Sequence, residues 1–462
     1  MGFGSNDPDG LMRTPTKNTR LTGRQKFEQL WHTDRNTPMG LLLRRYWWPF
    51  AGASEFDSSQ TRSVRLLGED LVAFKDLSGQ FGLVQRHCPH RGANLVDGMV
   101  EACGLRCSYH GWLFSKDGEC LEAPYEDIAG NHRLRSTVRV TSYPVQEMGG
   151  LLWAYLGPEP LPLLPQYEFF NWDNGFRQIV LSEIPCNWFQ CQENSMDPVH
   201  FEWRHSNWSM RKSGKSQGYS AKHLKLKFEE FEYGFRYYRL REGSDETDPL
   251  WTIGRVCLWP NGLYTGNHAE FRTPVDDHNT LSIAWHFSRV PAEREPYVQK
   301  SIPTWTSPTK TPEGTWITTH VTNQDFVAWV GQGVIANRAI EKLGASDKGI
   351  ALMRKRFLAD LDLVSRGQNP KGVFDSGNQV PVIILPAVER EVLIKGLPLN
   401  AMLENSVYRE RLRTFVFQAG QPDHVRREFI DAMGLDGLDI GQRDETVDLL
   451  SVTNERTDGK HQ

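Results

Sequence analysis

The chain has 462 residues, 39% of them hydrophobic and 24% charged, which is the composition of a globular protein with room for two or three domains. Its net charge of −4 gives no basic surface that would favour nucleic acid, and no apolar run approaches the roughly 18 residues that cross a bilayer. The polar, glycine-rich start lacks the apolar segment of a signal peptide, so we expect a cytoplasmic protein with no membrane partner.

The N-terminal block is expected to be rich in β-structure. Residues 1–23 are predicted to form a disordered arm, and residues 24–48 a helix with a connection. Short β-type runs follow from about residue 63 to residue 156. Three prolines between residues 158 and 162 can continue neither helix nor strand, so we place a domain boundary at residue 160.

The second block, residues 161–440, mixes strands and helices. It is expected to contain a hairpin that turns at Tyr233–Gly234, three further strands and two helices, namely strands 255–259, 264–272 and 281–290 and helices 339–343 and 347–366. Strands followed by helices indicate an α+β fold. Residues 441–462 are predicted to be a frayed tail.

One pair of short motifs has the spacing of a metal site. Cys88 and His90 form C-x-H, and Cys107 and His110 form C-x-x-H after sixteen intervening residues, each half being followed by a glycine. Two such turns can hold two irons with bridging sulfides, the cysteines on one iron and the histidines on the other. The odd number of cysteines argues against a disulfide framework, and Cys103 is expected to be a small core residue.

Structural zinc is the main alternative for these four ligands. Zinc fingers also use two cysteines and two histidines, but they usually pair cysteine with cysteine first and histidine with histidine second. Here each half supplies one of each, and the flanking CPHRG and CSYHGW sequences strengthen the case for a two-iron cluster.

A second metal site is indicated further along the chain. If the segment were helical, Glu193, Asp197 and His200 would share one face, while His205 would point away. Pro198 should kink such a helix, so only a distorted or ended helix brings both imidazoles to one metal. Two histidines are by themselves a weak signal.

A distant carboxylate would complete a site with two histidines and one acid. This set of ligands binds iron(II) and leaves other coordination positions of the metal open. Asp325 is the best candidate because it lies in a mostly apolar stretch, where a charge is costly unless it is paired. Asp360 and Asp362 are rivals, but their charged surroundings predict solvated side chains.

Taken together, these motifs resemble the catalytic α subunits of Rieske oxygenases of the phthalate dioxygenase-like type, from about residue 37 to residue 366. The resemblance implies a Rieske domain over residues 24–160 and a helix-grip catalytic domain, a curved antiparallel sheet over a long helix. It implies that Cys88, His90, Cys107 and His110 hold a [2Fe-2S] cluster, and that a mononuclear iron is held by the residues His200, His205 and Asp325.

The resemblance also implies an assembly and a role for Asp197. In the family, the cluster of one subunit supplies the iron of its neighbour in a trimer, and the Asp197 equivalent bridges a histidine of each centre. A homotrimer, or a dimer of trimers, is therefore expected. The alternative role for Asp197 is a helix cap ahead of Pro198, and both roles can coexist.

The expected function is that of a terminal oxygenase. The chain has no convincing site for a dinucleotide or a flavin, so electrons should come from NAD(P)H through a separate ferredoxin or reductase. Residues 254–260 and Asp276–Asp277 resemble family members that act on bulky lignin-derived methoxy aromatics. The resemblance implies O-demethylation of a methoxylated biaryl acid such as 5,5'-dehydrodivanillate as the leading reaction, and the runner-up is cis-dihydroxylation of a phthalate-like acid. An electron-transfer protein without catalysis and a zinc-stabilised binding module are the alternatives from other classes.

An aromatic acid would also need a cation for its carboxylate. The sequence offers Arg204, Arg236 and Arg255 as candidates without selecting one of them.

Overall fold

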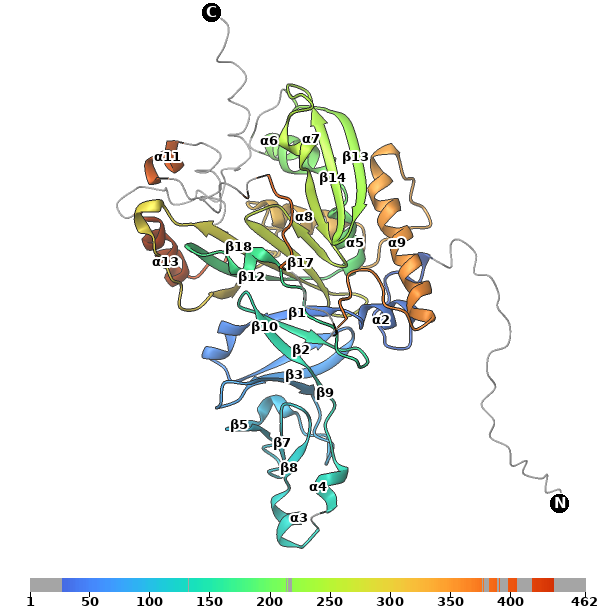
Figure 1. Cartoon of the computed structure of the whole chain (residues 1–462), viewed down its shortest axis with the longest axis vertical. Helices are drawn as coiled ribbons and strands as arrows, with labels where there is room; N and C mark the ends of the chain where they lie inside the picture. The colour runs from blue at the N-terminus through green and yellow to red at the C-terminus, as the bar shows by residue number, and fades with distance from the viewer. Residues whose placement is uncertain are drawn as a thin grey trace, which may run out of the picture.

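The computed structural model describes residues 27–435 except 132, 213, 215–217, 376, 378–381, 389, 391–397 and 405–417. The predicted arm and tail lie outside the described residues. A narrow β-rich region built from the N-terminal block forms one end of the molecule, and a broader region around one large sheet forms the other (Figure 1). In the part of the chain that the structure describes, no helix has both the length and the apolar character required to cross a bilayer.

Three small antiparallel sheets form the N-terminal region. The first sheet has the strand order β1 (Trp47–Gly52), β11 (Leu151–Tyr155), β10 (Val145–Met148). The second has the order β2 (Thr61–Leu66), β3 (Glu69–Lys75), β4 (Phe81–Gln85), β9 (Ser142–Tyr143). The third has the order β5 (Met99–Glu101), β6 (Gly104–Arg106), β7 (Leu113–Phe114), β8 (Cys120–Glu122). Short helices connect them: α2 (Pro38–Leu43), η1 (Ala53–Asp57), η2 (Leu95–Asp97), α3 (Pro124–Ile128) and α4 (Arg133–Thr137).

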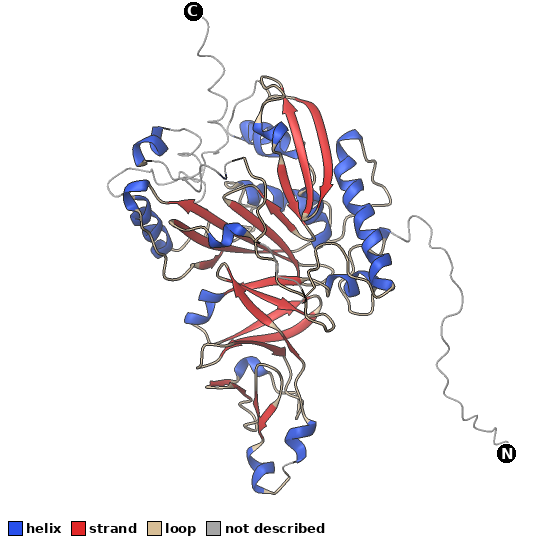
Figure 2. Cartoon of the chain, in the orientation of Figure 1, coloured by secondary structure: helices blue, strands red, loops and turns tan. Residues whose placement is uncertain are grey.

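One eight-stranded sheet organises the second region (Figure 2). Its strands in spatial order are β13 (His223–Phe231), β14 (Gly234–Arg241), β15 (Arg255–Leu258), β16 (Gly262–Tyr264), β17 (His268–Pro274), β18 (Thr280–Arg289), β12 (Gly175–Ile184) and β19 (Thr304–Thr306). All neighbours are antiparallel except β12 and β19, which are parallel, so the sheet is mixed rather than purely antiparallel.

The second region also contains helices. They are η3 (Glu168–Asn171), α5 (Trp188–Asn194), the π-helix η4 (Phe201–Trp208), α6 (Ser209–Lys212), α7 (Pro249–Thr252), η5 (Ala292–Arg294), α8 (Val321–Gly331), η6 (Ala345–Asp347), α9 (Lys348–Ser365), α11 (Leu399–Glu404) and α13 (Asp423–Met433). Of these helices, α5, α7 and α9 contact the sheet. The α+β class predicted from the sequence is confirmed.

Several element predictions are confirmed, and two are wrong. The hairpin turns between β13 and β14 at Tyr233–Gly234 as expected, and the helix predicted at 347–366 is α9. The strand predicted at 264–272 is instead two strands, β16 and β17, separated by a turn. Residues 339–343 form no helix, since Ile340 and Leu343 are 74% and 45% exposed and find no apolar surface to cover. The domain boundary at residue 160 stays a prediction.

An aromatic cluster fixes helix α5, which precedes the predicted iron-binding segment. Trp188 and Phe189 of α5 are fully buried against Phe357 of α9, with ring centroids 5.8 and 5.4 Å apart, and Trp188 also meets Trp48 of β1. Each such buried ring contributes about 2 kcal/mol by removal of apolar area from water. Helix α8 is held to β17 by Arg272, whose guanidinium lies 5.4 Å from the Trp329 ring centre.

Candidate metal centres

The two cysteine–histidine motifs form matching loops. In each loop the N–H of the cysteine donates a hydrogen bond of 2.8 Å to the carbonyl of the fifth residue after it. The carbonyl of the cysteine in turn accepts from the N–H of the fourth residue after it. That residue is Gly92 in the loop of Cys88 and Gly111 in the loop of Cys107, with φ of 74° and 75°. The left-handed conformation explains why glycine stands at both positions.

The thiols lie inside and the imidazoles outside. Cys88 and Cys107 are 3% and 2% exposed, and burial together with the neighbouring Cys107 side chain raises the pKa of the Cys88 thiol to about 11. His90 and His110 lie at the surface with ring centroids 4.4 Å apart, and His90 stacks on Trp112. Paired buried sulfurs and paired exposed imidazoles fit a cluster with two cysteines on one iron and two histidines on the other.

Replacing either loop glycine by alanine should strain its loop. We expect Gly92→Ala and Gly111→Ala each to cost about 1 kcal/mol of stability, because a Cβ disfavours the left-handed conformation. The two costs should be similar, since the Cβ of Gly111 would meet Pro124 only at 3.4 Å, an ordinary contact, and that of Gly92 meets nothing described within 4 Å. Denaturant unfolding and acid-labile sulfide per chain measure the effect. Gly331→Ala, in open space at the end of α8 without positive φ, is the control and should lower neither quantity.

The segment around His200 departs from the continuous helix considered for it. Helix α5 ends at Asn194, because Pro198 cannot donate within a helix and its ring would clash with the Asn194 carbonyl. Glu193 therefore does not join the histidines, and the distorted or ended helix predicted from Pro198 is confirmed. The Glu193 carboxylate instead forms buried ion pairs with Arg338 at 2.7 Å and Arg354 at 2.6 Å.

A π-helix brings the two histidines together. Residues Phe201–Trp208 form η4, directly after His200. Hydrogen bonds in a π-helix run from residue i to i+5, so residues five apart lie about one turn apart on the same side. The imidazole centroids of His200 and His205 are accordingly 5.2 Å apart, although an ordinary helix would separate them.

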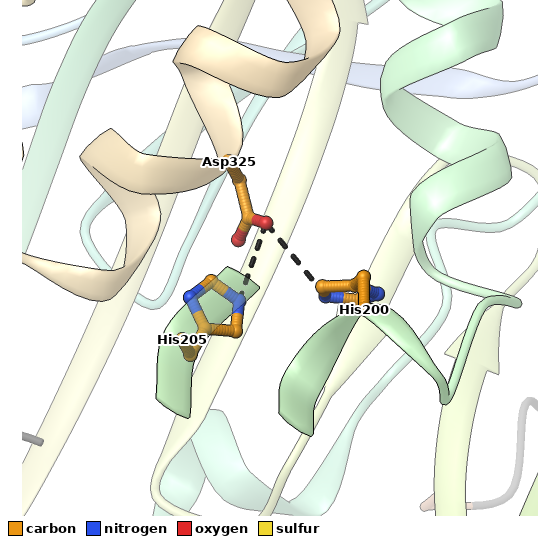
Figure 3. Close-up of side chains that lie close together, drawn as sticks. All are labelled: His200, His205 and Asp325. Carbon is orange, nitrogen blue, oxygen red and sulfur yellow. Dashed lines mark ion pairs between the residues drawn. The ribbon is translucent and has the colours of Figure 1, made fainter. Parts of the chain in front are cut away.

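Asp325 of helix α8 completes this site (Figure 3). Its Oδ1 lies 3.3 Å from His205 Nε2 and 3.7 Å from His200 Nε2, and the three ligand atoms all lie within 4.8 Å of one another. The three side chains are largely buried. Burial acts to raise the pKa of Asp325, but His205, His200 and Arg272 outweigh it and keep the pKa below its usual value. An ionised carboxylate facing two imidazole Nε2 atoms suits a divalent cation.

Neighbouring polar groups orient these three side chains. The Nδ1–H of His205 donates to Gln324 Oε1 at 3.0 Å, and Asn194 Nδ2 donates to Asp325 Oδ1 at 3.4 Å. Hydrogen bonds of this kind fix the tautomer and direction of a ligand. Sequence reasoning missed both amides, although Gln324 stands directly before Asp325 and could have been noticed for that reason.

Asp197 occupies the start of the π-helical segment. Its Oδ1 accepts from the N–H groups of Val199 at 2.8 Å and His200 at 3.4 Å, and its Oδ2 lies 3.7 Å from His200 Nδ1. Burial acts to raise its pKa, but His200 and these N–H groups lower it below the usual value. The cap and the contact with His200 thus coexist.

Two sequence predictions near these sites are wrong. Asp360 is not solvated: it is fully buried, its Oδ1 lies 3.2 Å from Arg356, and it accepts from the Lys371 N–H. Asp362 is exposed as predicted. Cys103 is not a core residue but an exposed one, since it lies in the tight turn between β5 and β6.

Comparison with known proteins decides the family. Residues 46–144 match the model of the Rieske [2Fe-2S] domain, and residues 309–393 match the LigXa C-terminal domain like model. The chain resembles the 5,5'-dehydrodivanillate O-demethylase oxygenase subunit of Sphingobium sp. (strain NBRC 103272 / SYK-6), with 54% sequence identity over 410 residues. The aligned region covers 88% of this chain and 96% of the relative. This chain belongs to the Rieske non-haem iron oxygenases.

Further relatives agree with this assignment. The Rieske oxygenase described here is 33% identical to the phenoxybenzoate dioxygenase subunit alpha of Ectopseudomonas oleovorans, over 75% of this chain and 87% of the relative. It is 30% identical to the phthalate 4,5-dioxygenase oxygenase subunit of Pseudomonas putida, over 78% of this chain and 89% of the relative. The solved structure of Pseudomonas putida CBB5 NdmA shares the fold, with a TM-score of 0.51 at 21% identity, covering 70% of this chain and 92% of that one.

The family assignment settles the class of protein and its cofactors. The chain is an enzyme with a Rieske [2Fe-2S] cluster and a non-haem iron, as the sequence predicted. The zinc-stabilised module and the electron-transfer protein without catalysis are therefore set aside. The residues of the two loops and the His200–His205–Asp325 group fit these cofactors by donor type, burial and position.

Proposed function

We propose that this chain is the terminal oxygenase of a system that O-demethylates a lignin-derived methoxylated biaryl acid, with 5,5'-dehydrodivanillate as the leading substrate. The observation that carries the proposal is the 54% identity to an O-demethylase oxygenase subunit over 96% of that subunit's length. The reaction consumes one O₂, two electrons and two protons, and it converts the aryl methyl ether into a phenol, formaldehyde and water.

The proposed ligand assignment follows the geometry of the two centres. Cys88, His90, Cys107 and His110 would hold the cluster, and His200, His205 and Asp325 would hold the iron. When bound, the two groups together supply electrons one at a time and activate dioxygen. Gln324 and Asp197 would keep the Nδ1 side of each iron-binding imidazole engaged, so that each Nε2 faces the metal.

The proposed assembly is a homotrimer or a dimer of trimers. The cluster loops belong to the narrow end of the molecule in Figure 1, and helices α5 and α8 belong to the broad end. His90 and His110 are exposed, and Asp197 is partly exposed, as a contact between neighbouring subunits requires. We further propose a cytoplasmic location, a separate ferredoxin or reductase that draws on NAD(P)H, and domains over residues 24–160 and 161–440.

The product identifies the reaction. Purified, iron-loaded oxygenase with a compatible reductase and NADH is expected to release about one formaldehyde per 5,5'-dehydrodivanillate consumed, with the product that has lost one methyl group seen by mass spectrometry. Phthalate serves as the second substrate, because the phthalate 4,5-dioxygenase relative makes cis-dihydroxylation the runner-up. A cis-diol from phthalate without formaldehyde from dehydrodivanillate would replace demethylation by dihydroxylation as the function.

A further inference from the structure

Two of the three arginines considered for a substrate carboxylate already have partners. Arg236 forms an ion pair with Glu229. The Arg204 Nε–H donates to the Gln324 carbonyl at 2.9 Å, and its guanidinium lies 4.1 Å from the Trp208 ring centre. Both side chains therefore have structural roles that a substrate would have to disrupt.

Arg255, at the start of β15, is different. It is half-buried, and among the described residues no carboxylate lies within ion-pair distance of it. The acid nearest to this group of arginines is Glu202, which is taken up by Arg239 at 3.0 Å, Arg241 at 3.3 Å and His223 at 2.9 Å. The Glu202 carboxylate is thus shared by three basic side chains. Arg255 adds a further positive charge, and no carboxylate among the described residues pairs with it.

Arg255 lies next to the iron-binding histidines. Its guanidinium is 4.3 Å from the centre of the Phe201 ring, and that ring lies 4.5 Å from His200 and 5.4 Å from His205, between centroids. The cation and both imidazoles therefore border the same aromatic side chain. A substrate carboxylate held by Arg255 would lie beside the residues that surround the predicted iron.

Tyr237 adds a second polar group at the same place. It is the register partner of Arg255 across β14 and β15, so both side chains project from the same face of the sheet. Tyr237 is 1% exposed, and its hydroxyl makes no hydrogen bond of standard geometry in the described part of the chain, although burial raises its pKa and the nearby Arg255 guanidinium acts to lower it. An unsatisfied buried hydroxyl is unfavourable, and a ligand that accepts its hydrogen bond would recover that loss.

We propose that Arg255 binds a carboxylate of the aromatic substrate, with the Tyr237 hydroxyl as a second donor, and thereby directs the opposite side of the ring toward the His200–His205–Asp325 centre. This inference rests on the proposed function only in that the substrate is an aromatic acid. Guanidinium is suited to the task because it stays charged when partly buried and can donate two parallel hydrogen bonds to one carboxylate.

The test compares an acid with its uncharged ester. Binding of 5,5'-dehydrodivanillate and of its dimethyl ester to anaerobic, iron-loaded enzyme is measured by calorimetry. Arg255→Gln should weaken binding of the acid about 100-fold, since it removes a partly buried charge pair, and should change binding of the ester about threefold or less. Arg255→Lys should recover part of the loss, and Tyr237→Phe should weaken acid binding about fivefold.

A matched control separates this role from a structural one. Arg236→Gln, on the neighbouring strand β14, removes an arginine paired with Glu229 and should leave the preference for acid over ester unchanged. If Arg255 only supported the Phe201 ring, Arg255→Gln would weaken acid and ester equally and lower the thermal unfolding midpoint. That result, or equal binding of acid and ester by the unaltered enzyme, would overturn the proposal.

The outcome is distinguishable from a failure of the proposed reaction. Formaldehyde release with no preference for the acid would leave demethylation standing and remove Arg255 as the anchor. Absence of formaldehyde, with phthalate binding that depends on Arg255, would support the anchor and remove demethylation.

Discussion

Replacing Asp325 by alanine is expected to lower formaldehyde release from 5,5'-dehydrodivanillate by about 1000-fold or more, because the oxygen-activating metal would be lost. Asp325 supplies the single carboxylate of the group formed with His200 and His205, and no other acid of the described residues joins them within ligand distance. Two imidazoles alone bind iron(II) weakly, so the iron content should fall from three atoms per chain to two.

The cluster should be unaffected by this change, because its loops belong to the other end of the molecule (Figure 1). Iron, acid-labile sulfide and the visible spectrum of the cluster, measured together, separate loss of one centre from loss of both. Asp362→Ala is the matched control, since Asp362 lies exposed on α9 and should keep full activity and three irons. Retention of three irons and normal turnover by Asp325→Ala would refute the assignment of this residue.

The cluster loops could be predicted almost completely from the sequence, and the iron site only in part. Cys88 with His90, and Cys107 with His110, form local motifs whose spacing already limits the geometry. The distance from His205 to Asp325 is 120 positions in the chain, so only the apolar surroundings of Asp325 and the family resemblance pointed to it.

The π-helix could not have been found by inspecting periodicity. Hydrophobic and polar patterns distinguish repeats of 2 and 3.6 residues, and an eight-residue π-helix gives neither. Pro198 did predict that the helix would kink or end, but nothing in the sequence showed that a π-helix would follow it. The burial of Asp360 depends on Arg356 and on the N–H of Lys371, a contact between α9 and the following segment that no local pattern encodes.

Asp197→Asn should separate electron transfer from metal binding. An amide has the shape of the carboxylate, and its oxygen can still accept from the N–H of Val199, so the turn that leads into η4 should persist. The negative charge 3.7 Å from His200 Nδ1 would be lost. We expect three irons per chain and a reducible cluster, but product formation lower by about 100-fold, because the carboxylate that would couple the two centres is lost.

The decisive measurement is a single turnover with a chemically reduced cluster. On mixing with substrate and O₂, the unaltered enzyme should reoxidise its cluster as product forms, and the Asp197→Asn enzyme should do so about 100-fold more slowly, in keeping with a carboxylate that couples the two centres. Asp245→Asn is the control, since Asp245 Oδ1 accepts from the Thr247 N–H at 2.8 Å in a similar turn but no histidine contact is found for it among the described residues. If the Asp197→Asn enzyme reoxidised its cluster at the rate of the unaltered enzyme, Asp197 would act only as a cap for the π-helical segment. Loss of the third iron would instead make it a support for His200, with no part in carrying electrons between subunits.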